Sequence, residues 1–328
     1  DLYKIPVPKL LAIALSNNDI NLLAQIFELP KHLAPSDPII RVTPVNVRKV
    51  SNMSYDADAV TSEWQALVHL LSVLKKVKGS SADSFEVQKK LHSQFNAAFA
   101  SSAGNWCVLA LHVVCQNTFY LANKADGETK ENHKEMAVTL LQESFSRTLN
   151  DRTKYDPDEK LSNTGSKKCG VLAIVNLLFR IYFKLSKLRL CKNLLKPVEV
   201  YSLHKNSGMT QRIVFNYYTG RLFLFEDNFE RAQECLEFCM KHEQNPANRR
   251  RVLNFLVPVK LLKGKLPSRH LLETYSMNQY ESLIEGLRTG DLAKFSEALE
   301  ENSELFLKRG IFLLLEKCKV IAYRNLFK

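Results

Sequence analysis

The chain has 328 residues, of which 45% are hydrophobic and 24% are charged, and its formal net charge at pH 7 is +12. This composition is that of a folded protein and excludes a disordered or collagen-like chain. Polar residues interrupt every apolar run before it reaches the roughly 18 residues of a membrane span, so we expect no membrane segment.

The positive charge is confined to the second half of the chain. Residues 1–160 hold 18 Lys and Arg against 18 Asp and Glu, whereas residues 161–328 hold 28 against 16. A basic half joined to a neutral half indicates a polyanionic partner, either a nucleic acid or a very acidic protein. The polar stretch 150–168 reads as a loop, and we place a domain boundary there, between residues 160 and 161.

Amphipathic helices are predicted throughout the neutral half. The stretch 9–28 predicts two short helices around a polar turn at 16–19, whereas the proline-containing stretch 30–58 predicts a long surface connection. Longer helices are expected over 64–77, 85–99, 106–123 and 136–149. The third of these is strongly apolar and is expected to lie at the centre of the core.

A run without acidic residues follows the loop. Residues 167–196 contain eight Lys and Arg and no Asp or Glu. Arg180, Lys184 and Lys187 have the i, i+4, i+7 spacing that puts side chains on one face of a helix. Solvent-facing helices commonly mix both signs of charge. Two interpretations are left open, a solvated surface and a contact with a polyanion.

Residues 216–267 have the pattern of a tetratricopeptide hairpin. With Gly220 as position eight of the repeat, Phe229 falls at position seventeen and Ala232 at position twenty, where the repeat places packing residues. Related helix–turn–helix signatures at 10–29 and 287–292 favour a helical-repeat solenoid. The residues expected to support the hairpin are Tyr217, Tyr218, Gly220, Phe229, Ala232 and Pro258.

Basic residues gather after this hairpin. Arg249, Arg250 and Arg251 open the next helix, where positive charge opposes the helix dipole. Guanidinium groups bind planar anions well, which favours phosphate or carboxylate contacts over the alternative of a solubilising turn. A helix over 271–286 and an apolar, basic segment over 306–328 follow. The residues predicted to bind a nucleic acid or an acidic partner are Arg180, Lys184, Lys187, Arg249, Arg250, Arg251, Lys260, Lys263, Lys265, Arg269, Lys317 and Arg324.

The sequence shows no arrangement for catalysis or metal binding. The eight histidines form no His-Glu-x-x-His pair, and the seven cysteines form no Cys-x-x-Cys pair. An odd number of unpaired cysteines favours free thiols in a reducing compartment. We expect no enzyme, no cofactor and no metal.

The chain resembles the PCI family, the helical-repeat-plus-winged-helix subunits of the proteasome lid, the signalosome and translation initiation factor three. Within that family it is similar to the messenger-RNA-export and signalosome-subunit-twelve branch. The similarity is strong from about residue 167 to the end and weak before residue 106. The residues that carry it are 217–221, Phe229 with Ala232, 252–260, Gly264 with Pro267, 310–317 and 323–327, with 175–179 and 181–185.

This resemblance implies an all-α, tetratricopeptide-like solenoid, with 161–305 as its basic part and 306–328 as the truncated start of a winged helix. It implies a non-enzymatic subunit in the nucleus, at the nuclear pore, and also in the cytoplasm. Such subunits pair with a large Sac/GANP-type scaffold subunit and a small acidic DSS/SEM-type protein, and present a basic surface to RNA or DNA. The alternative is a structural subunit of a signalosome-like or splicing-associated complex without direct nucleic-acid binding.

Overall fold

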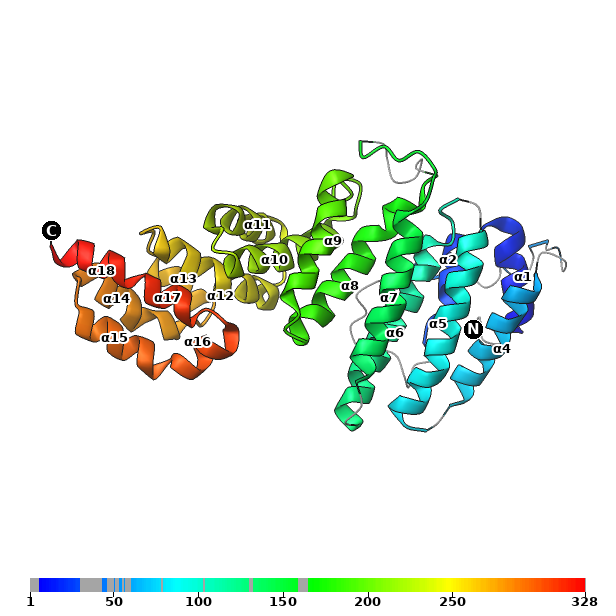
Figure 1. Cartoon of the computed structure of the whole chain (residues 1–328), viewed down its shortest axis with the longest axis horizontal. Coiled ribbons are helices and arrows are strands. Elements are labelled where there is room, and N and C mark those ends of the chain that lie inside the picture. The colour runs from blue at the N-terminus through cyan, green and yellow to red at the C-terminus, as the bar shows by residue number, and fades with distance from the viewer. Residues whose placement is uncertain are drawn as a thin grey trace. The chain divides into compact units, whose positions relative to one another are not determined.

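The computed structural model describes residues 6–29, 43–45, 50, 53–54, 56, 60–77, 79–102, 104–129, 132–158 and 165–327. Helices are the regular elements of these residues (Figure 1), and no β-strand occurs among them. The predicted all-α helical-repeat fold is therefore confirmed. None of the helices in the described ranges is long and apolar enough to cross a membrane.

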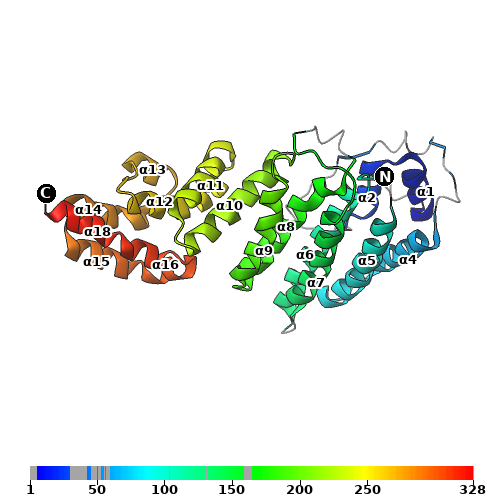
Figure 2. The ribbon, with the colours of Figure 1, turned by 45° about the horizontal axis from the view of Figure 1, so that its top comes forward.

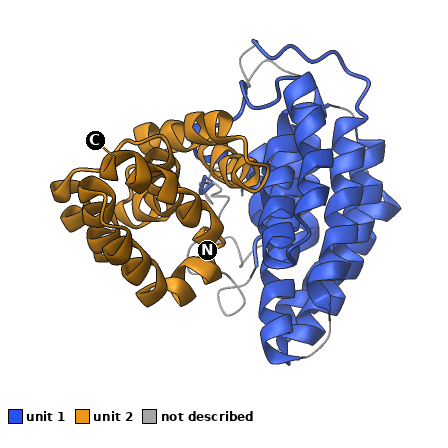
Figure 3. Ribbon diagram, turned by 60° about the vertical axis from the view of Figure 1, so that its left-hand side comes forward, with its two compact units in different colours: residues 1–211 blue, residues 212–328 orange. Residues whose placement is uncertain are grey.

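The chain forms two compact units, unit 1 over residues 1–211 and unit 2 over residues 212–328 (Figure 3). Unit 1 contains α1 (Val7–Asn17), α2 (Ile20–Ile26), α4 (Ser62–Lys76), α5 (Ser81–Ser101), α6 (Val108–Glu128), α7 (His133–Leu149), the 3₁₀ turn η3 (Lys167–Gly170), α8 (Val171–Lys184) and α9 (Leu188–Val200). From α4 to α9 each helix packs on the next (Figure 2). This neighbour-to-neighbour packing is the arrangement of helical-repeat proteins.

The helices of unit 1 begin and end where local chemistry requires it. Between α1 and α2, Asn18 adopts the left-handed conformation, and the Asp19 carboxylate accepts a 3.0 Å hydrogen bond from the Leu22 amide. Two short helices around a polar turn were predicted here and are confirmed. At the start of α5, Ser80 and Asp83 form a reciprocal capping box. Most of the predicted connection over 30–58 lies outside the described residues.

A buried polar network joins α5, α6 and α7 in the centre of unit 1. His92 is fully buried, with Nδ1 2.8 Å from Thr118 Oγ1 and Nε2 2.7 Å from Ser144 Oγ. The Thr118 hydroxyl donates to the Val114 carbonyl, so its oxygen accepts from Nδ1, and the Ser144 hydroxyl beside Nε2 also lies 2.8 Å from Asn96 Oδ1. Burial lowers the pKa of His92 to about 3, and the ring is neutral at pH 7.

The predicted basic run over 167–196 is not one continuous element. η3 leads directly into α8, which ends at Lys184. Ser186 then has a φ of 56°, and α9 starts at Leu188. The first lysine of the run is buried. Lys167 is 7% exposed and its ammonium donates to the carbonyls of Phe99 (2.6 Å) and Ser102 (2.7 Å), so it caps the C-terminus of α5.

Unit 2 holds most of α10 (Met209–Phe225), followed by α11 (Phe229–His242), α12 (Pro246–Leu262), α13 (Arg269–Thr274), the 3₁₀ turn η4 (Asn278–Tyr280), α14 (Glu281–Thr289), α15 (Leu292–Glu301), α16 (Ser303–Arg309), α17 (Phe312–Lys317) and α18 (Lys319–Leu326). The predicted helix over 271–286 is wrong as a single element. Ser276 at φ 49° breaks it, because the Met277 amide turns back to the Leu272 carbonyl.

The segment 306–328 is divided into three short helices within its described residues. Gly310, at φ 71°, ends α16, and Cys318 separates α17 from α18. The predicted turn at Gly290 is present, since this glycine ends α14 at φ 75° and the Asp291 side chain caps α15. The predicted boundaries at residues 160 and 305, and the assignment of 306–328 to a winged helix, stay predictions.

Candidate nucleic-acid interface

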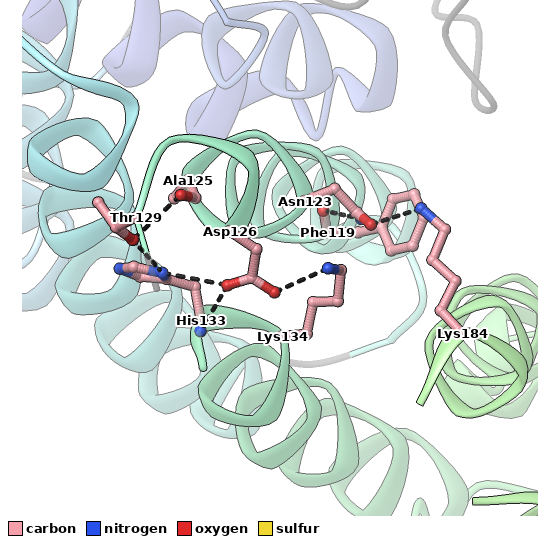
Figure 4. Close-up of polar contacts among 8 residues, drawn as sticks. All are labelled: Phe119, Asn123, Ala125, Asp126, Thr129, His133, Lys134 and Lys184. Carbon is pink, nitrogen blue, oxygen red and sulfur yellow. Dashed lines mark hydrogen bonds and ion pairs between the residues drawn. The ribbon is translucent and has the colours of Figure 1, made fainter. Parts of the chain in front are cut away.

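One face of α6 anchors cations that come from the two following helices. Phe119, Asn123 and Asp126 have the i, i+4, i+7 spacing of a single helix face. Lys184 reaches this face from α8, and its Nζ lies 2.6 Å from Asn123 Oδ1 and 5.6 Å from the centre of the Phe119 ring. Lys134 reaches it from α7, with its Nζ 2.8 Å from Asp126 Oδ2 (Figure 4).

Asp126 also fixes the start of α7. Its Oδ1 accepts hydrogen bonds from the His133 amide at 2.8 Å and lies 3.1 Å from His133 Nδ1. Partial burial alone would raise the pKa of the Asp126 carboxyl, but the hydrogen bonds from Lys134 and His133 outweigh burial and lower this pKa. The carboxylate thus caps α7 and neutralises Lys134.

Lys187 does not share one helix face with Arg180 and Lys184, whereas it was predicted to do so. Arg180 precedes Lys184 by one turn on α8, and its Nε is buried without a hydrogen-bond partner among the described residues. Lys187 lies beyond the end of α8, because the chain turns at Ser186. Its Nζ instead pairs with Glu135 Oε1 of α7 at 2.5 Å.

The arginine triplet lies in the second turn of α12 rather than at its first residue, Pro246. Arg249 places its guanidinium 5.9 Å from the centre of the Tyr275 ring, and Arg250 donates to the Ser276 carbonyl at 2.9 Å. These two arginines therefore support the irregular segment between α13 and η4. Arg251 is exposed and makes a 3.4 Å contact with Asn248.

Two of the predicted binding lysines on α12 and just after it are paired with carboxylates of α11. Lys260 lies 2.9 Å from Glu237, and Lys263 lies 3.4 Å from Glu230. The hydrogen bond from Lys260 lowers the pKa of Glu237. Lys265 is exposed and has no carboxylate within 4.0 Å in the described part of the chain.

The remaining predicted residues lie on α13, α17 and α18 of unit 2. Arg269 is exposed and pairs with Glu273, one turn later on α13, at 3.1 Å. Lys317 pairs with Asp227 at 2.6 Å and lies 5.6 Å from the centre of the Phe229 ring. Arg324 lies over Gly264, where a Cβ atom would come within 3.3 Å of the guanidinium.

The residues expected to support the hairpin lie where α10, α11 and α12 meet. A Cβ at Gly220 would lie 3.0 Å from Leu236, so the glycine lets α10 and α11 approach closely. Tyr217 contacts Tyr218 and Phe255 edge to face. Ala232 is fully buried, and Phe229 packs against the core.

Pro258 interrupts the hydrogen bonding of α12. It lies buried inside the helix and has no amide hydrogen to donate to the Asn254 carbonyl one turn earlier. The hydroxyl of Tyr280 donates to this carbonyl at 3.2 Å, and Arg309 donates to Asn254 Oδ1 at 2.8 Å. The proline is therefore accommodated by side chains from two later elements.

Comparison with known proteins places the chain in a family, although no protein-family model matches it. It is 33% identical to PCI domain-containing protein 2 of Xenopus laevis, over 79% of this chain and 66% of that protein. It is 30% identical to Enhanced ethylene response protein 5 of Arabidopsis thaliana, over 85% and 67%, and 31% identical to Protein CSN12 homolog of Neurospora crassa, over 83% and 66%. The chain belongs to the PCI-domain family. Within the family it is of the type of PCI domain-containing protein 2, as its sequence resemblance implied.

This PCI-family chain spans about two thirds of the length of these relatives.

Sequence reasoning missed the residues that hold the cations of α7 and α8 in place. Lys134, Asn123 and Asp126 were not singled out, because they come from the neutral half and become neighbours of Lys184 only when α6, α7 and α8 pack. The only available signal was the i, i+4, i+7 spacing of Phe119, Asn123 and Asp126.

The described residues of this PCI protein contain no group of three or more His, Cys, Asp or Glu side chains that could hold a metal ion. The seven cysteines are free. Burial raises the pKa of Cys107 and Cys115 to about 12, so these thiols stay protonated at neutral pH and are poor nucleophiles.

Proposed function

We propose that this PCI-family protein is a non-enzymatic scaffold subunit of a nuclear messenger-RNA-export complex of the transcription-coupled type. In this role it pairs with a large Sac/GANP-type scaffold subunit and a small acidic DSS/SEM-type protein, and contributes a basic surface to RNA or DNA. The observation that supports it is the charge excess of residues 161–328, 28 basic against 16 acidic, on a chain of this family. Electrostatic attraction of this kind underlies sequence-independent nucleic-acid binding.

Ion pairs within the chain reduce the number of basic side chains that are available to a ligand. Lys187, Lys260, Lys263, Arg269 and Lys317 each have a carboxylate partner within the chain. Arg251, Lys265 and Arg324 are exposed and, among the described residues, have no carboxylate within 4.0 Å. We expect these three residues of unit 2 to contribute more to binding than the paired lysines, because a paired lysine must lose one anion to gain another.

The test is binding of a labelled single-stranded RNA across a series of salt concentrations. Replacing Arg251, Lys265 and Arg324 together by Glu is expected to weaken binding by tenfold or more and to reduce the salt slope by about 2, since each phosphate contact on a single strand contributes about 0.7. The control variant replaces Lys241, Arg288 and Lys308 by Glu, which changes the same charge at exposed positions outside the predicted surface. Equal loss in both variants would contradict the assignment of these three residues.

A second function is favoured by the similarity to Protein CSN12 homolog. In this alternative the protein is a structural subunit of a signalosome-like or splicing-associated complex, and its basic half contacts only other proteins. Wild-type protein that fails to bind RNA at about 0.1 M salt, alone and with its large partner, would support this alternative. Capture of a large scaffold subunit is expected under both functions and does not separate them.

A further inference from the structure

Two cations lie one helical turn apart on α8, and Lys184 of this pair reaches the face of α6 that carries the ion pair of Lys134 and Asp126. Arg180 and Lys184 follow each other by one turn on α8, and Lys134 reaches the same face of α6 from α7 (Figure 4). Like charges at i and i+4 on a helix repel, which weakens the helix. The chain therefore keeps an unfavourable arrangement of charge at this place.

The Asp126 carboxylate on this face of α6 is already engaged. Asp126 binds the Lys134 ammonium at 2.8 Å and accepts from the amide of His133, whose Nδ1 is also within 3.1 Å. It therefore leaves Arg180 and Lys184 without a carboxylate of their own among the described residues. Burial, followed by the charges of Lys134 and Arg180, lowers the pKa of Lys184, so both of these cations lie within electrostatic reach of Lys184.

The cations are also held in place before any ligand arrives. The Asn123 carboxamide oxygen accepts from the Lys184 ammonium at 2.6 Å, and this ammonium lies 5.6 Å from the centre of the Phe119 ring. Arg180 is half-buried and its Nε is enclosed, so its guanidinium has little freedom. Side chains that are already ordered lose less entropy when they bind an anion.

We propose that Arg180 and Lys184 form a binding site for one phosphate group of a single-stranded nucleic acid, beside the ion pair of Lys134 and Asp126. The oxygens of a phosphate can accept from one guanidinium and one ammonium group, and its negative charge would relieve their repulsion. The half-buried Phe119 ring beside the cations adds the aromatic surface that single strands use for stacking. This inference rests on the proposed function and assigns unit 1 a part in it.

The experiment compares two double variants of the full chain by fluorescence anisotropy with a labelled twelve-nucleotide oligouridylate. The test variant carries Arg180→Gln and Lys184→Gln, and the control carries Arg189→Gln and Lys196→Gln, which are exposed residues of α9 in the same unit. Both lose two positive charges. The test variant is expected to bind about tenfold more weakly, with a salt slope smaller by about 1.4, and the control to change by less than threefold.

Thermal unfolding separates binding from folding. Because the test variant removes a repulsive pair, we expect its melting temperature to equal or exceed that of the wild type. A clear drop in melting temperature with unchanged RNA binding would show that these residues serve the fold and would overturn the proposal. Lys134 is left unchanged in the test, because its removal would also unpair Asp126.

The outcomes distinguish this site from the proposed function as a whole. If the wild type and both variants bind RNA equally, the phosphate site is wrong while nucleic-acid binding through unit 2 stands. A second titration uses inorganic pyrophosphate. In another outcome, pyrophosphate binds to the wild type but not to the test variant, and RNA binds to neither. The assignment of the phosphate group to a nucleic acid is then wrong, and a small phosphate compound is the ligand.

Discussion

At the scale of single residues, the stability of unit 2 depends on how α12 tolerates Pro258. The proline leaves the Asn254 carbonyl without its helical partner, and Tyr280 supplies the missing donor from η4 at 3.2 Å. Tyr280 is fully buried, and its hydroxyl reaches this carbonyl from the core of the unit. One hydroxyl group therefore connects the middle of α12 to an element that starts sixteen residues after the end of α12.

Replacing Tyr280 by Phe is expected to destabilise unit 2 by about 1–2 kcal/mol, because it leaves a buried carbonyl unpaired while preserving the packing of the ring. Urea denaturation followed by circular dichroism measures this loss. Tyr323→Phe is the matched control, since Tyr323 is exposed. A loss of the same size in both variants would show that the hydrogen bond to Asn254 is not its cause.

At the scale of elements, α14 and α15 meet the C-terminal helix α18 at one glycine. Gly290 ends α14 at φ 75°, and a Cβ on it would lie 2.5 Å from the Leu326 amide nitrogen. Glycine is therefore required at this position for two reasons, namely its left-handed backbone conformation and the close approach of α18.

Gly290→Ala is expected to destabilise unit 2 by more than about 2 kcal/mol, because the left-handed conformation costs about 1–2 kcal/mol and the backbone of α18 must also move. Gly127→Ala in α6 is the control. That glycine has open space around it, and alanine there should stabilise the helix by about 0.5–1 kcal/mol. Thermal unfolding by circular dichroism compares the two, and equal melting temperatures would contradict the expected contact with α18.

Local pattern predicted the helices well and their breaks poorly. The turn at 16–19 and the glycine at 290 could be predicted, because Asn, Asp and Gly at helix ends have a local physical role. The break at Ser276 could not, since Met277 is fixed there by the core it enters. Lys167 looked like one more surface cation in a basic run, but it caps α5 across 65 residues of sequence.

The candidate interface could likewise be predicted only in part from the sequence. Sequence identified Arg180 and Lys184 as candidates, and it predicted twelve basic residues without knowing their partners. Five of those residues have carboxylates within the chain. Lys260 of α12 pairs with α11, and Lys317 of α17 pairs with Asp227 in the turn between α10 and α11. Pairing of this kind depends on tertiary packing, so spacing along the sequence does not contain it.

At the scale of the whole molecule, the two units are expected to respond differently to acid. The two histidines with lowered pKa values both lie in unit 1, His92 at about 3 and His112 at about 4. Between about pH 6.5 and 4 the unfolded chain binds protons at these rings that the folded unit does not. Unit 1 therefore loses stability as the pH falls, by up to about 1.4 kcal/mol per pH unit for each histidine.

Both tryptophans, Trp64 and Trp106, also lie in unit 1, so their fluorescence reports its unfolding. The midpoint of urea denaturation measured by this fluorescence is expected to be lower at pH 5 than at pH 7. In the His92→Gln variant the difference between the two pH values should shrink. A midpoint that is the same at both pH values in the wild type would contradict the assignment of neutral, buried rings.

The free cysteines give the molecule its own reporters of local opening. Cys107, Cys115 and Cys191 are buried in unit 1, and Cys239 and Cys318 are buried in unit 2. A thiol reagent can modify them only after the surrounding helices separate, so their alkylation rates measure the opening equilibrium of each unit without any introduced label. Mass spectrometry of alkylated peptides would therefore show, in a single sample, which unit opens more readily when a partner is added or removed.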